Sequence, residues 1–293
     1  MADRAIDVQA LARVQARQAS ADTAPWLHGE VGRRMAERLP VIRRQPDTVI
    51  DWWSRAGGSQ AVLAAAYPKA RAMRVEPSLP DGPSTPAPWW SASRWRREAA
   101  AIAEAEVPAR AGQLLWANMM LHTVPDPALL MQRWQRALAV DGFLMFSTLG
   151  PDTLGTLRAL YRDAGWGPAH AAFTDMHDLG DMLVAAGFAD PVMDQERLTL
   201  TWPTPEALLG ELRTLGGNAD PARFAGLRTP RWRARLLAAL RERAAEDGRI
   251  ALEFELVYGH AFNPLPRARV TGETRVAVDD LRAMARSGAR PRP

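Results

Sequence analysis

Residues 48–58 constrain the fold of this chain more than any other stretch of its sequence. The β-branched run Thr48–Ile50 ends at Asp51, and Gly57-Gly58 precedes the helix-like segment Ser59–Ala66. A strand, a tight loop and a helix in this order form the unit that binds nucleosides in doubly wound α/β proteins. The loop of such a unit uses glycine because its backbone approaches the ligand closely. We therefore predict a nucleoside-type loop at this position.

The segments after this loop alternate between strand-like and helix-like patterns. Three further runs are predicted as strands: Ala70–Val75 (followed by Glu76), Gln113–Asn118 and Phe143–Thr148. Helices are predicted between them, at Trp89–Glu106 and from Pro127 to about Ala139, the second with Asp126 as its N-cap. This alternation predicts a parallel sheet with helices on both faces.

The second half of the chain is predicted to contain a helical insertion between two late strands. Apolar residues alternate with polar ones in Leu198–Trp202 and in Leu252–Tyr258, as in strands with one buried face. Arg- and Leu-rich helices are predicted between them, at Pro205–Thr214 and Pro230–Glu246. They resemble a helical cap, inserted at about residues 204–247, on an α/β core.

The two ends of the chain differ from its centre. Residues 1–27 are polar and alanine-rich without firm periodicity, so we expect a flexible segment. Residues 28–263 form the expected domain. Residues 264–293 are rich in arginine and proline and are expected to be a disordered tail.

Composition limits the possible function classes. The chain has 293 residues, of which 47% are hydrophobic and 24% charged, as expected of a globular protein. No apolar run approaches the roughly 20 residues needed to span a bilayer, so no membrane association is expected. Cysteine is absent and the five histidines show no ligand spacing, so we predict no metal site. These features fit a cytoplasmic location. We also expect a monomer.

The net charge of +4 comes almost entirely from arginine, since Lys69 is the only lysine. Coding bias and solvated helix faces are the favoured explanation of this excess, and attraction to an acidic partner is the alternative. Nucleic acid is not the expected partner, because the aromatic residues are not interleaved with the basic ones. The arginines available to an acidic partner fall into two groups: Arg94, Arg96 and Arg97, and Arg228, Arg231, Arg233 and Arg235.

Several later motifs resemble those of a known family. Leu115–His122, followed by Asp126-Pro127, is similar to the fourth-strand motif of class I S-adenosylmethionine-dependent methyltransferases, and Phe143–Leu154 is similar to their fifth-strand region. More specifically, Phe173–Asp181 and Gly187–Asp194 resemble the malonyl-acyl-carrier-protein O-methyltransferases of biotin synthesis. Arg249–Leu252 and Tyr258–Phe262 resemble the final strand of these enzymes. The resemblance covers about residues 28–263.

This resemblance implies a seven-stranded sheet with one antiparallel edge strand and a helical insertion before it. It also implies methylation of the free carboxyl of malonyl-acyl-carrier protein, with acyl-carrier protein as the acidic partner. A carboxylate is already a nucleophile, so the protein has only to align it and exclude water. His177 and Arg197 are candidates for contacting the malonyl carboxylate, although each is equally compatible with an ordinary surface role.

The cofactor loop departs from the family pattern. The resemblance places the S-adenosylmethionine-binding residues at Asp51, Gly57, Gly58, Glu76 and Asn118, with Glu76 holding the ribose hydroxyls. Two positions that are glycine in the family are occupied by Trp53 and Arg55. We expect the indole to take the volume of the methionine or ribose part of the cofactor, which impairs binding or reshapes the pocket. Arg55 is then placed to reach the methionyl carboxylate.

The sequence leaves two functions open. One is an active S-adenosylmethionine-dependent O-methyltransferase acting on malonyl-acyl-carrier protein or a similar acyl thioester. The other is a catalytically silent paralogue that binds acyl-carrier protein or a partner enzyme. A nicotinamide-dependent oxidoreductase is disfavoured because Gly-x-Gly-x-x-Gly is missing from the loop. No acid before the fourth strand has the register expected for an adenine contact, since Glu98, Glu104 and Glu106 all miss it.

Overall fold

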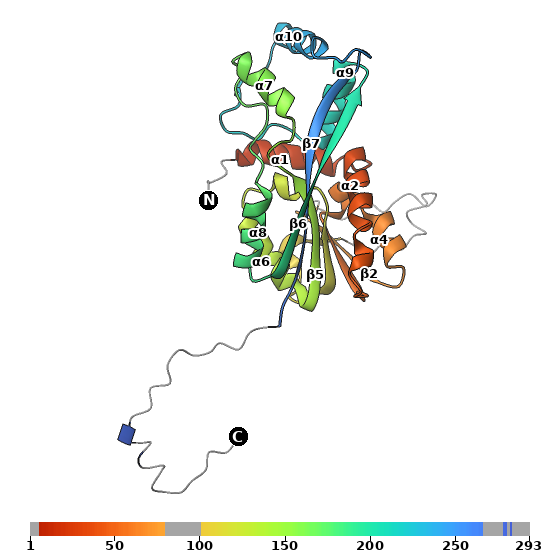
Figure 1. Ribbon diagram of the computed structural model, residues 1–293, viewed down its shortest axis with the longest axis vertical. Coiled ribbons are helices and arrows are strands. Elements are labelled where there is room, and N and C mark those ends of the chain that lie inside the picture. The colour runs from red at the N-terminus through yellow and green to blue at the C-terminus, as the bar shows by residue number, and fades with distance from the viewer. Residues whose placement is uncertain (1–5, 80–100, 266–277, 280–281, 283–293) are drawn as a thin grey trace.

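A seven-stranded sheet forms the centre of the molecule (Figure 1). The computed structural model describes residues 6–79, 101–265, 278–279 and 282. The strands are β1 (Thr48–Trp52), β2 (Arg71–Glu76), β3 (Ile102–Ala103), β4 (Gly112–Ala117), β5 (Leu138–Leu149), β6 (Ala189–Trp202) and β7 (Ile250–Phe262). Their order is β3-β2-β1-β4-β5-β7-β6. The pairs from β3 to β5 are parallel, and β7 is antiparallel to both of its neighbours, β5 and the edge strand β6. The predicted seven-stranded α/β sheet with one reversed strand is confirmed.

Helices cover both faces of this sheet because its central strands bury side chains on both sides. Along β4, Leu114 and Trp116 pack into one hydrophobic cluster, whereas Leu115 and Ala117 pack into the other. The first cluster lies under α2 (Trp26–Ala36) and α4 (Gln60–Ala66), and the second under α6 (Pro127–Ala137) and α8 (Met176–Ala185). As predicted, Asp126 caps α6, and its carboxylate accepts a hydrogen bond from the Leu129 N–H at 2.9 Å.

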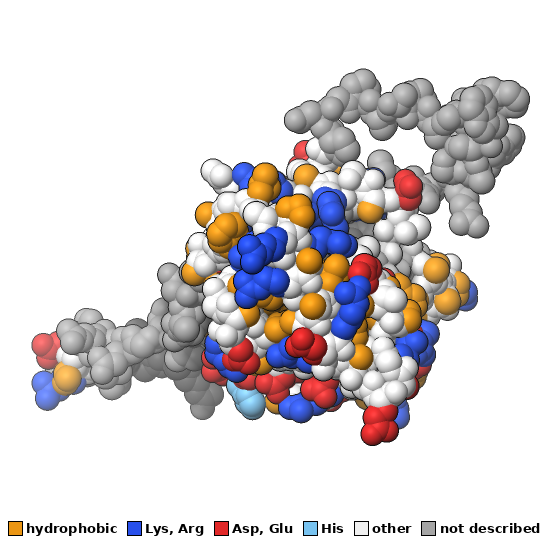
Figure 2. All heavy atoms as spheres, turned by 90° about the horizontal axis from the view of Figure 1, so that it is seen from above, with side chains coloured by type: hydrophobic (Ala, Val, Ile, Leu, Met, Phe, Trp, Pro, Cys, Tyr) orange, Lys and Arg blue, Asp and Glu red, His pale blue; other side chains and the backbone are white. Residues whose placement is uncertain are grey.

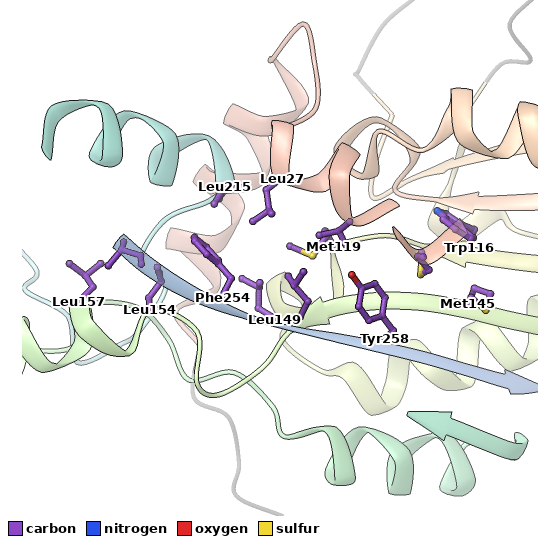
Figure 3. Packing of buried hydrophobic residues seen from close by; sticks show 14 of the residues in the cluster. Leu27, Trp116, Met119, Met145, Leu149, Leu154, Leu157, Leu215, Phe254 and Tyr258 are labelled. Atoms are coloured by element: carbon purple, nitrogen blue, oxygen red, sulfur yellow. The ribbon is translucent and has the colours of Figure 1, made fainter. Parts of the chain in front are cut away.

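The first cluster continues beyond the sheet into a cap, which comprises α7 (Gly155–Asp163), α9 (Pro205–Leu215), α10 (Pro230–Arg241) and the ends of β6 and β7. Strands β6 and β7 extend past the other strands toward these helices (Figure 1). Helices α9 and α10 lie between β6 and β7, where the helical insertion was expected. Leu149 and Phe254 belong to the same buried cluster as Leu157 of α7 and Leu215 of α9 (Figure 3). The cap is therefore packed onto the sheet through one continuous core.

The N-terminal segment differs from the prediction. Residues 1–27 were expected to be flexible, but Val8–Ala19 forms helix α1, capped by Asp7. Its residues Ala10, Leu11 and Val14 are buried. The Asp7 N–H donates to the Ala219 carbonyl at 2.8 Å, and the Gln18 side chain donates to the Leu215 carbonyl at 3.3 Å. The helix forms because the cap supplies the apolar surface that it lacks alone.

A second difference concerns the segment before β4. A helix was predicted at Trp89–Glu106, but residues 102–103 form β3 and Glu104–Glu106 forms a 3₁₀ turn, η2. Pairing of Ile102 with Val75 overrides the helix preference of this alanine- and glutamate-rich stretch. Residues 89–100 of the predicted helix, and most of the predicted tail at 264–293, lie outside the described residues.

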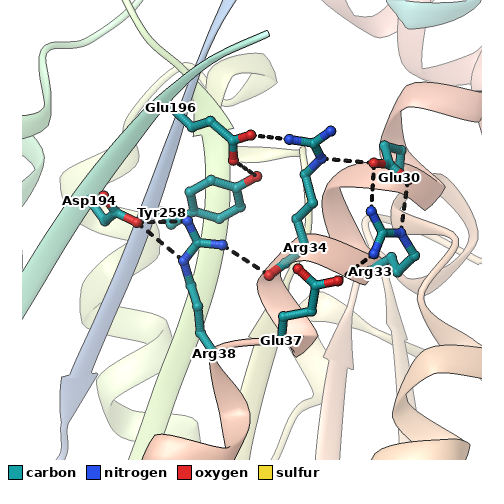
Figure 4. A network of polar contacts seen from close by, with 8 residues as sticks. All are labelled: Glu30, Arg33, Arg34, Glu37, Arg38, Asp194, Glu196 and Tyr258. Atoms are coloured by element: carbon teal, nitrogen blue, oxygen red, sulfur yellow. Dashed lines mark hydrogen bonds and ion pairs between the residues drawn. The ribbon is translucent and has the colours of Figure 1, made fainter.

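A polar network fastens α2 to the far edge of the sheet (Figure 4). Arg38, just after the C-terminal end of α2, donates to the Asp194 carboxylate at 2.6 Å and lies over the Tyr258 ring, 3.9 Å from its centroid. Arg34 bridges Glu30 on its own helix and Glu196 on β6. The hydrogen bonds from Arg33 and Arg34 lower the pKa of Glu30 to about 2. The network fixes α2, whose first turn borders the loop after β1.

Candidate active site

The candidate site lies at the carboxyl ends of the parallel strands. In the order β3-β2-β1-β4-β5, the direction in which successive strands are added reverses between β1 and β4, and ligands of open α/β sheets bind at such a switch point. The loop after β1 contains the short helix α3 (Ser54–Gly57) and ends at Gly58. Gly58 has φ +64°, and a methyl group there would come within 2.6 Å of the Ala24 Cβ. This glycine is therefore required by both backbone conformation and space.

Trp53 is the first residue of this loop, between β1 and α3. It has φ +55° and ψ +50°, the left-handed conformation that glycine adopts readily and that costs other residues about 1–2 kcal/mol. The backbone thus keeps a glycine-type conformation although the residue is tryptophan. The side chain is only 6% exposed, and its indole Nε1–H donates to Glu104 Oε2 at 2.9 Å. Glu104, which missed the expected register in the sequence, is brought to the site by the turn after β3.

Glu76, the last residue of β2, is hydrogen-bonded to the loop after β1. Glu76 Oε1 accepts a hydrogen bond from the Arg55 backbone N–H at 3.0 Å, at the start of α3. Burial raises the pKa of Glu76 above its usual range. The Arg55 guanidinium turns away from the loop and donates to the Ala19 carbonyl of α1 at 2.6 Å. The structure does not direct it at a position above the loop, where a methionyl carboxylate was expected.

Asn118 joins three elements around the same loop. Its Nδ2 donates to the His28 carbonyl of α2 and to the Gly57 carbonyl, both at 2.7 Å. Its Oδ1 accepts a hydrogen bond from the Ser147 hydroxyl of β5, also at 2.7 Å. Both amide hydrogens of Asn118 are therefore used by the protein itself. The side chain holds the loop against α2 and β5 rather than facing an open space.

Asp51 and His28 are buried ionisable groups that both contact this loop. Asp51 is 2% exposed; its Oδ2 accepts a hydrogen bond from the Ser54 hydroxyl, and its Oδ1 has no hydrogen-bond partner among the described residues. Burial raises the pKa of Asp51 to about 6, although the Ser54 bond opposes the shift. His28 Nδ1 lies 2.7 Å from the Ala56 carbonyl, and burial lowers the pKa of this imidazole to about 4.

The pH dependence of folding should reveal this pair. His28 binds its proton more weakly in the folded state. Its contribution to the free energy of unfolding is therefore complete above pH 6.5 and is lost as the pH falls toward 4. Asp51 binds its proton more strongly when folded, so its contribution is complete below pH 3.8 and is lost as the pH rises through 6. Each contribution spans about 3 kcal/mol, and between pH 4 and 6 they oppose each other.

We expect Asp51→Asn to remove the Asp51 contribution and leave that of His28. The difference in free energy of unfolding between wild type and this variant should change by about 3 kcal/mol from pH 4 to 7, with the variant relatively less stable at the acid end. Urea denaturation across this range measures the difference, in which the contributions of carboxylates that do not interact with Asp51 cancel. If the free energies of unfolding of the two proteins change with pH in parallel, the raised pKa is not that of Asp51.

An apolar cavity lies beneath the cap, beside the carboxyl ends of β4 and β5. Its volume is about 360 Å³. Its walls come from α1, α7, α9 and the segments after β4 and β5, and include Leu11, Leu149, Leu157, Tyr161, Leu212 and Phe254. Its polar lining includes His122, His170, Arg17 and Arg213. A second cavity, of about 430 Å³, shares Arg17 and Arg213 with it and reaches Arg55 and Ala56 of the loop after β1.

The comparisons with known proteins extend over both the sheet and the cap. The methyltransferase domain family matches residues 4–190. Malonyl-acyl-carrier-protein O-methyltransferase of Laribacter hongkongensis (strain HLHK9) is 38% identical over 260 residues, which cover 86% of this chain and 87% of that protein. This chain belongs to the malonyl-acyl-carrier-protein O-methyltransferase family.

A second relative agrees with this membership, and a solved structure shares the fold. The family member of Gallionella capsiferriformans (strain ES-2) is 35% identical, over 91% of this chain and 94% of that protein. Among solved structures, the YcgJ protein from Bacillus subtilis has the same fold, with a TM-score of 0.50 at 10% identity, covering 79% of this chain and 98% of that one. The family resemblance of the sequence motifs is confirmed, and the chain is a member of a methyltransferase family that uses S-adenosylmethionine.

The five residues predicted to bind the cofactor all lie around one loop. Asp51, Gly57, Gly58, Glu76 and Asn118 surround the turn between β1 and α4. The protein itself uses the Asn118 amide, Asp51 Oδ2 and Glu76 Oε1, whereas Asp51 Oδ1 is buried without a hydrogen-bond partner among the described residues. Trp53 fills the space beside them. In this arrangement the residues present do not accommodate the nucleoside of S-adenosylmethionine, and the misfit lies at Trp53.

The two predicted substrate contacts lie elsewhere. His177 is in the first turn of α8, where its Nδ1 is 2.8 Å from Asp175 and its side chain is 81% exposed. Arg197 is on β6 and donates to the Asp152 carboxylate at 2.7 Å. Neither residue lines the cavity beneath the cap. Sequence reasoning missed the cavity because its walls come from segments far apart in the chain.

No helix in the described part of the chain is long and apolar enough to cross a membrane.

Proposed function

We propose that this chain methylates the free carboxyl of malonyl-acyl-carrier protein, or of a similar acyl thioester, in biotin synthesis. The observation that carries this proposal is the match to the named relatives, which runs through the sheet and the cap alike. We propose S-adenosylmethionine as the methyl donor, as membership of the family implies, and the cytoplasm as the site of action. The nucleoside of this donor does not fit beside Trp53 as the loop stands.

The cavity beneath the cap supports the substrate class. Its apolar walls suit the thioester end of a carrier arm, and they keep water away from the reacting carboxylate. Arg213 lines both this cavity and its neighbour near the loop, and this supports its guanidinium as the partner of a free carboxylate. A carboxylate needs no general base to act as a nucleophile, and alignment is the main requirement.

The surface of the cap supports an acidic carrier. Seen from above, Lys and Arg side chains gather on the upper face of the molecule (Figure 2). Helix α10 exposes Arg231, Arg233 and Arg235. Arg228 is used within the cap: it lies 4.5 Å from the Trp232 ring centroid and donates to the Trp166 carbonyl at 2.6 Å. Arg235 is exposed but also lies 5.7 Å from the Trp166 ring centroid.

The direct test is methyl transfer from labelled S-adenosylmethionine to malonyl-acyl-carrier protein, followed by mass spectrometry of the carrier. We expect the methyl ester of the malonyl group as product, and no labelling of acetyl-acyl-carrier protein, which has no free carboxyl. A protein that binds the donor and the carrier but forms no ester would contradict the proposal.

The carrier surface gives a separate prediction. Reversing charge with Arg231→Glu and Arg235→Glu should raise the KM for malonyl-acyl-carrier protein about tenfold at low salt, and the effect should shrink as salt is added. The matched control is Arg43→Glu, an exposed arginine in the segment before β1. With malonyl-pantetheine as substrate, which lacks the protein carrier, we expect wild-type KM. An equal rise in KM for both substrates would argue against a docking role for α10.

The arrangement at Trp53 favours a second function. If the cofactor never binds, the chain is a catalytically silent member of the family that holds acyl-carrier protein or a partner enzyme through its cap. Salt-sensitive carrier binding without methyl transfer, even at saturating donor, would favour this alternative.

A further inference from the structure

The Trp53 indole crosses the carboxyl end of β2. Trp53 directly follows β1, whereas Glu104 directly follows β3, and β2 lies between these two strands. Two strand spacings correspond to about 10 Å. The hydrogen bond from the indole Nε1–H to Glu104 Oε2, 2.9 Å long, therefore joins residues on either side of β2. The ring lies across the strand whose last residue is Glu76.

This is the surface on which a nucleoside lies in folds of this kind. The base and ribose occupy the crevice outside the carboxyl ends of the strands beside the switch point, and an acid near the end of β2 accepts from the ribose hydroxyls. Here Glu76 accepts from the Arg55 N–H instead. An indole is a flat bicyclic ring with an N–H donor at its edge, as adenine is with its exocyclic amino group. Glu104 accepts from that donor.

We propose that Trp53 is an internal occupant of the adenine position, and that S-adenosylmethionine binds only after the indole has left it. The identity of the displaced ligand rests on the proposed function. The internal occupancy itself rests on the position of the ring, its burial and its bond to Glu104. Glu104 is in turn held by Arg133, which donates to its other carboxylate oxygen at 2.6 Å.

The backbone at Trp53 is already suited to a smaller residue. With φ +55°, residue 53 has the conformation that glycine adopts without strain. Trp53→Gly therefore empties the position and leaves the path of the loop unchanged. A ligand that competes with an internal group binds with its intrinsic affinity reduced by the fraction of protein in the open state. Removing the occupant restores that affinity.

The experiment uses the full chain and S-adenosylhomocysteine as probe. We expect isothermal titration to give at least about a tenfold lower Kd for Trp53→Gly than for wild type. Trp53→Phe, which keeps a ring but loses the N–H donor, should lie between them. Trp26→Phe, at a position that is 60% exposed on α2, is the matched control and should bind like wild type. An unchanged Kd in Trp53→Gly, whether tight or undetectable, overturns the proposal.

A second measurement does not depend on the folding of the glycine variant. In protein labelled with 5-fluorotryptophan, the ¹⁹F resonance of Trp53 is assigned by its loss in Trp53→Phe. We expect this resonance to shift in wild type in step with S-adenosylhomocysteine saturation, because the ring leaves Glu104. Binding with no change at this resonance overturns the proposal.

The two proposals can fail separately. If Trp53→Gly binds S-adenosylhomocysteine tightly but never methylates malonyl-acyl-carrier protein, the internal occupancy stands and the proposed reaction fails. If wild type and Trp53→Gly methylate the carrier with the same KM for the donor, the reaction stands and the internal occupancy fails.

Discussion

Replacing Asn118 with leucine is expected to lower the free energy of unfolding by about 3–5 kcal/mol. The substitution keeps the shape of the side chain but removes its bonds to the His28 carbonyl, the Gly57 carbonyl and the Ser147 hydroxyl. Asn118 is 1% exposed, so the groups left behind cannot turn to water. Urea denaturation at pH 7 measures the loss.

Two further variants separate the donors of Asn118 from its acceptor. Ser147→Ala removes only one of the three bonds and should cost about 1–2 kcal/mol. Asn118→Asp keeps the acceptor for Ser147 but points a carboxylate oxygen at two carbonyls, and should be at least as damaging as leucine. If Asn118→Leu stays within about 1 kcal/mol of wild type, the loop is not held by this side chain.

Gly259→Ala is the other substitution expected to have a large effect, of about 3 kcal/mol or more. Gly259 on β7 is directly opposite Phe146 on β5. A methyl group there would come within 2.2 Å of Phe146 Cε1. The ring cannot retreat, because it is fully buried and packs against Trp134 at 5.9 Å between centroids. Thermal or urea unfolding of the purified variant checks the effect.

Gly180→Ala is the matched control for this prediction. In helix α8, the added methyl group would meet Met193 at an ordinary 3.6 Å, so we expect no loss and up to about 1 kcal/mol of gain. A double variant, Phe146→Ala with Gly259→Ala, should be less destabilised than the sum of its parts, because the alanine at 146 leaves room for the new methyl. If the destabilisations of the two single variants simply add, a clash with Phe146 is not the cause of the effect.

The sheet was predictable because its signals are local. The alternation of strand and helix, and the apolar pattern of residues such as Leu114–Ala117, are carried by a few neighbouring residues. Helix α1 and strand β3 were not predictable from local patterns. The first is stabilised by contacts with residues such as Leu215 and Ala219, about 200 positions away, and the second by pairing with β2. Long-range packing decides both.

The site was predictable in its position but not in its contacts. The pattern Asp51 to Gly57 located the loop, and the bulk of Trp53 indicated an obstruction. The direction of the indole depends on Glu104, whose place after β3 comes from tertiary structure. The raised pKa of Asp51 and the lowered pKa of His28 likewise follow from burial, which no short motif records.

The continuous core that joins the sheet to the cap makes the two a single cooperative unit. Leu149 and Phe254 connect α7 and α9 to the same packed interior as α2 and Trp116. Amides of β6 and β7 should therefore exchange with solvent through the same opening as those of β4, without an earlier release of the cap. Substitutions in the loop after β1 lie outside that shared interior. If the proposed function holds, a protein built in this way can lose or regain its hold on a methyl donor and still present an unaltered surface to an acyl carrier.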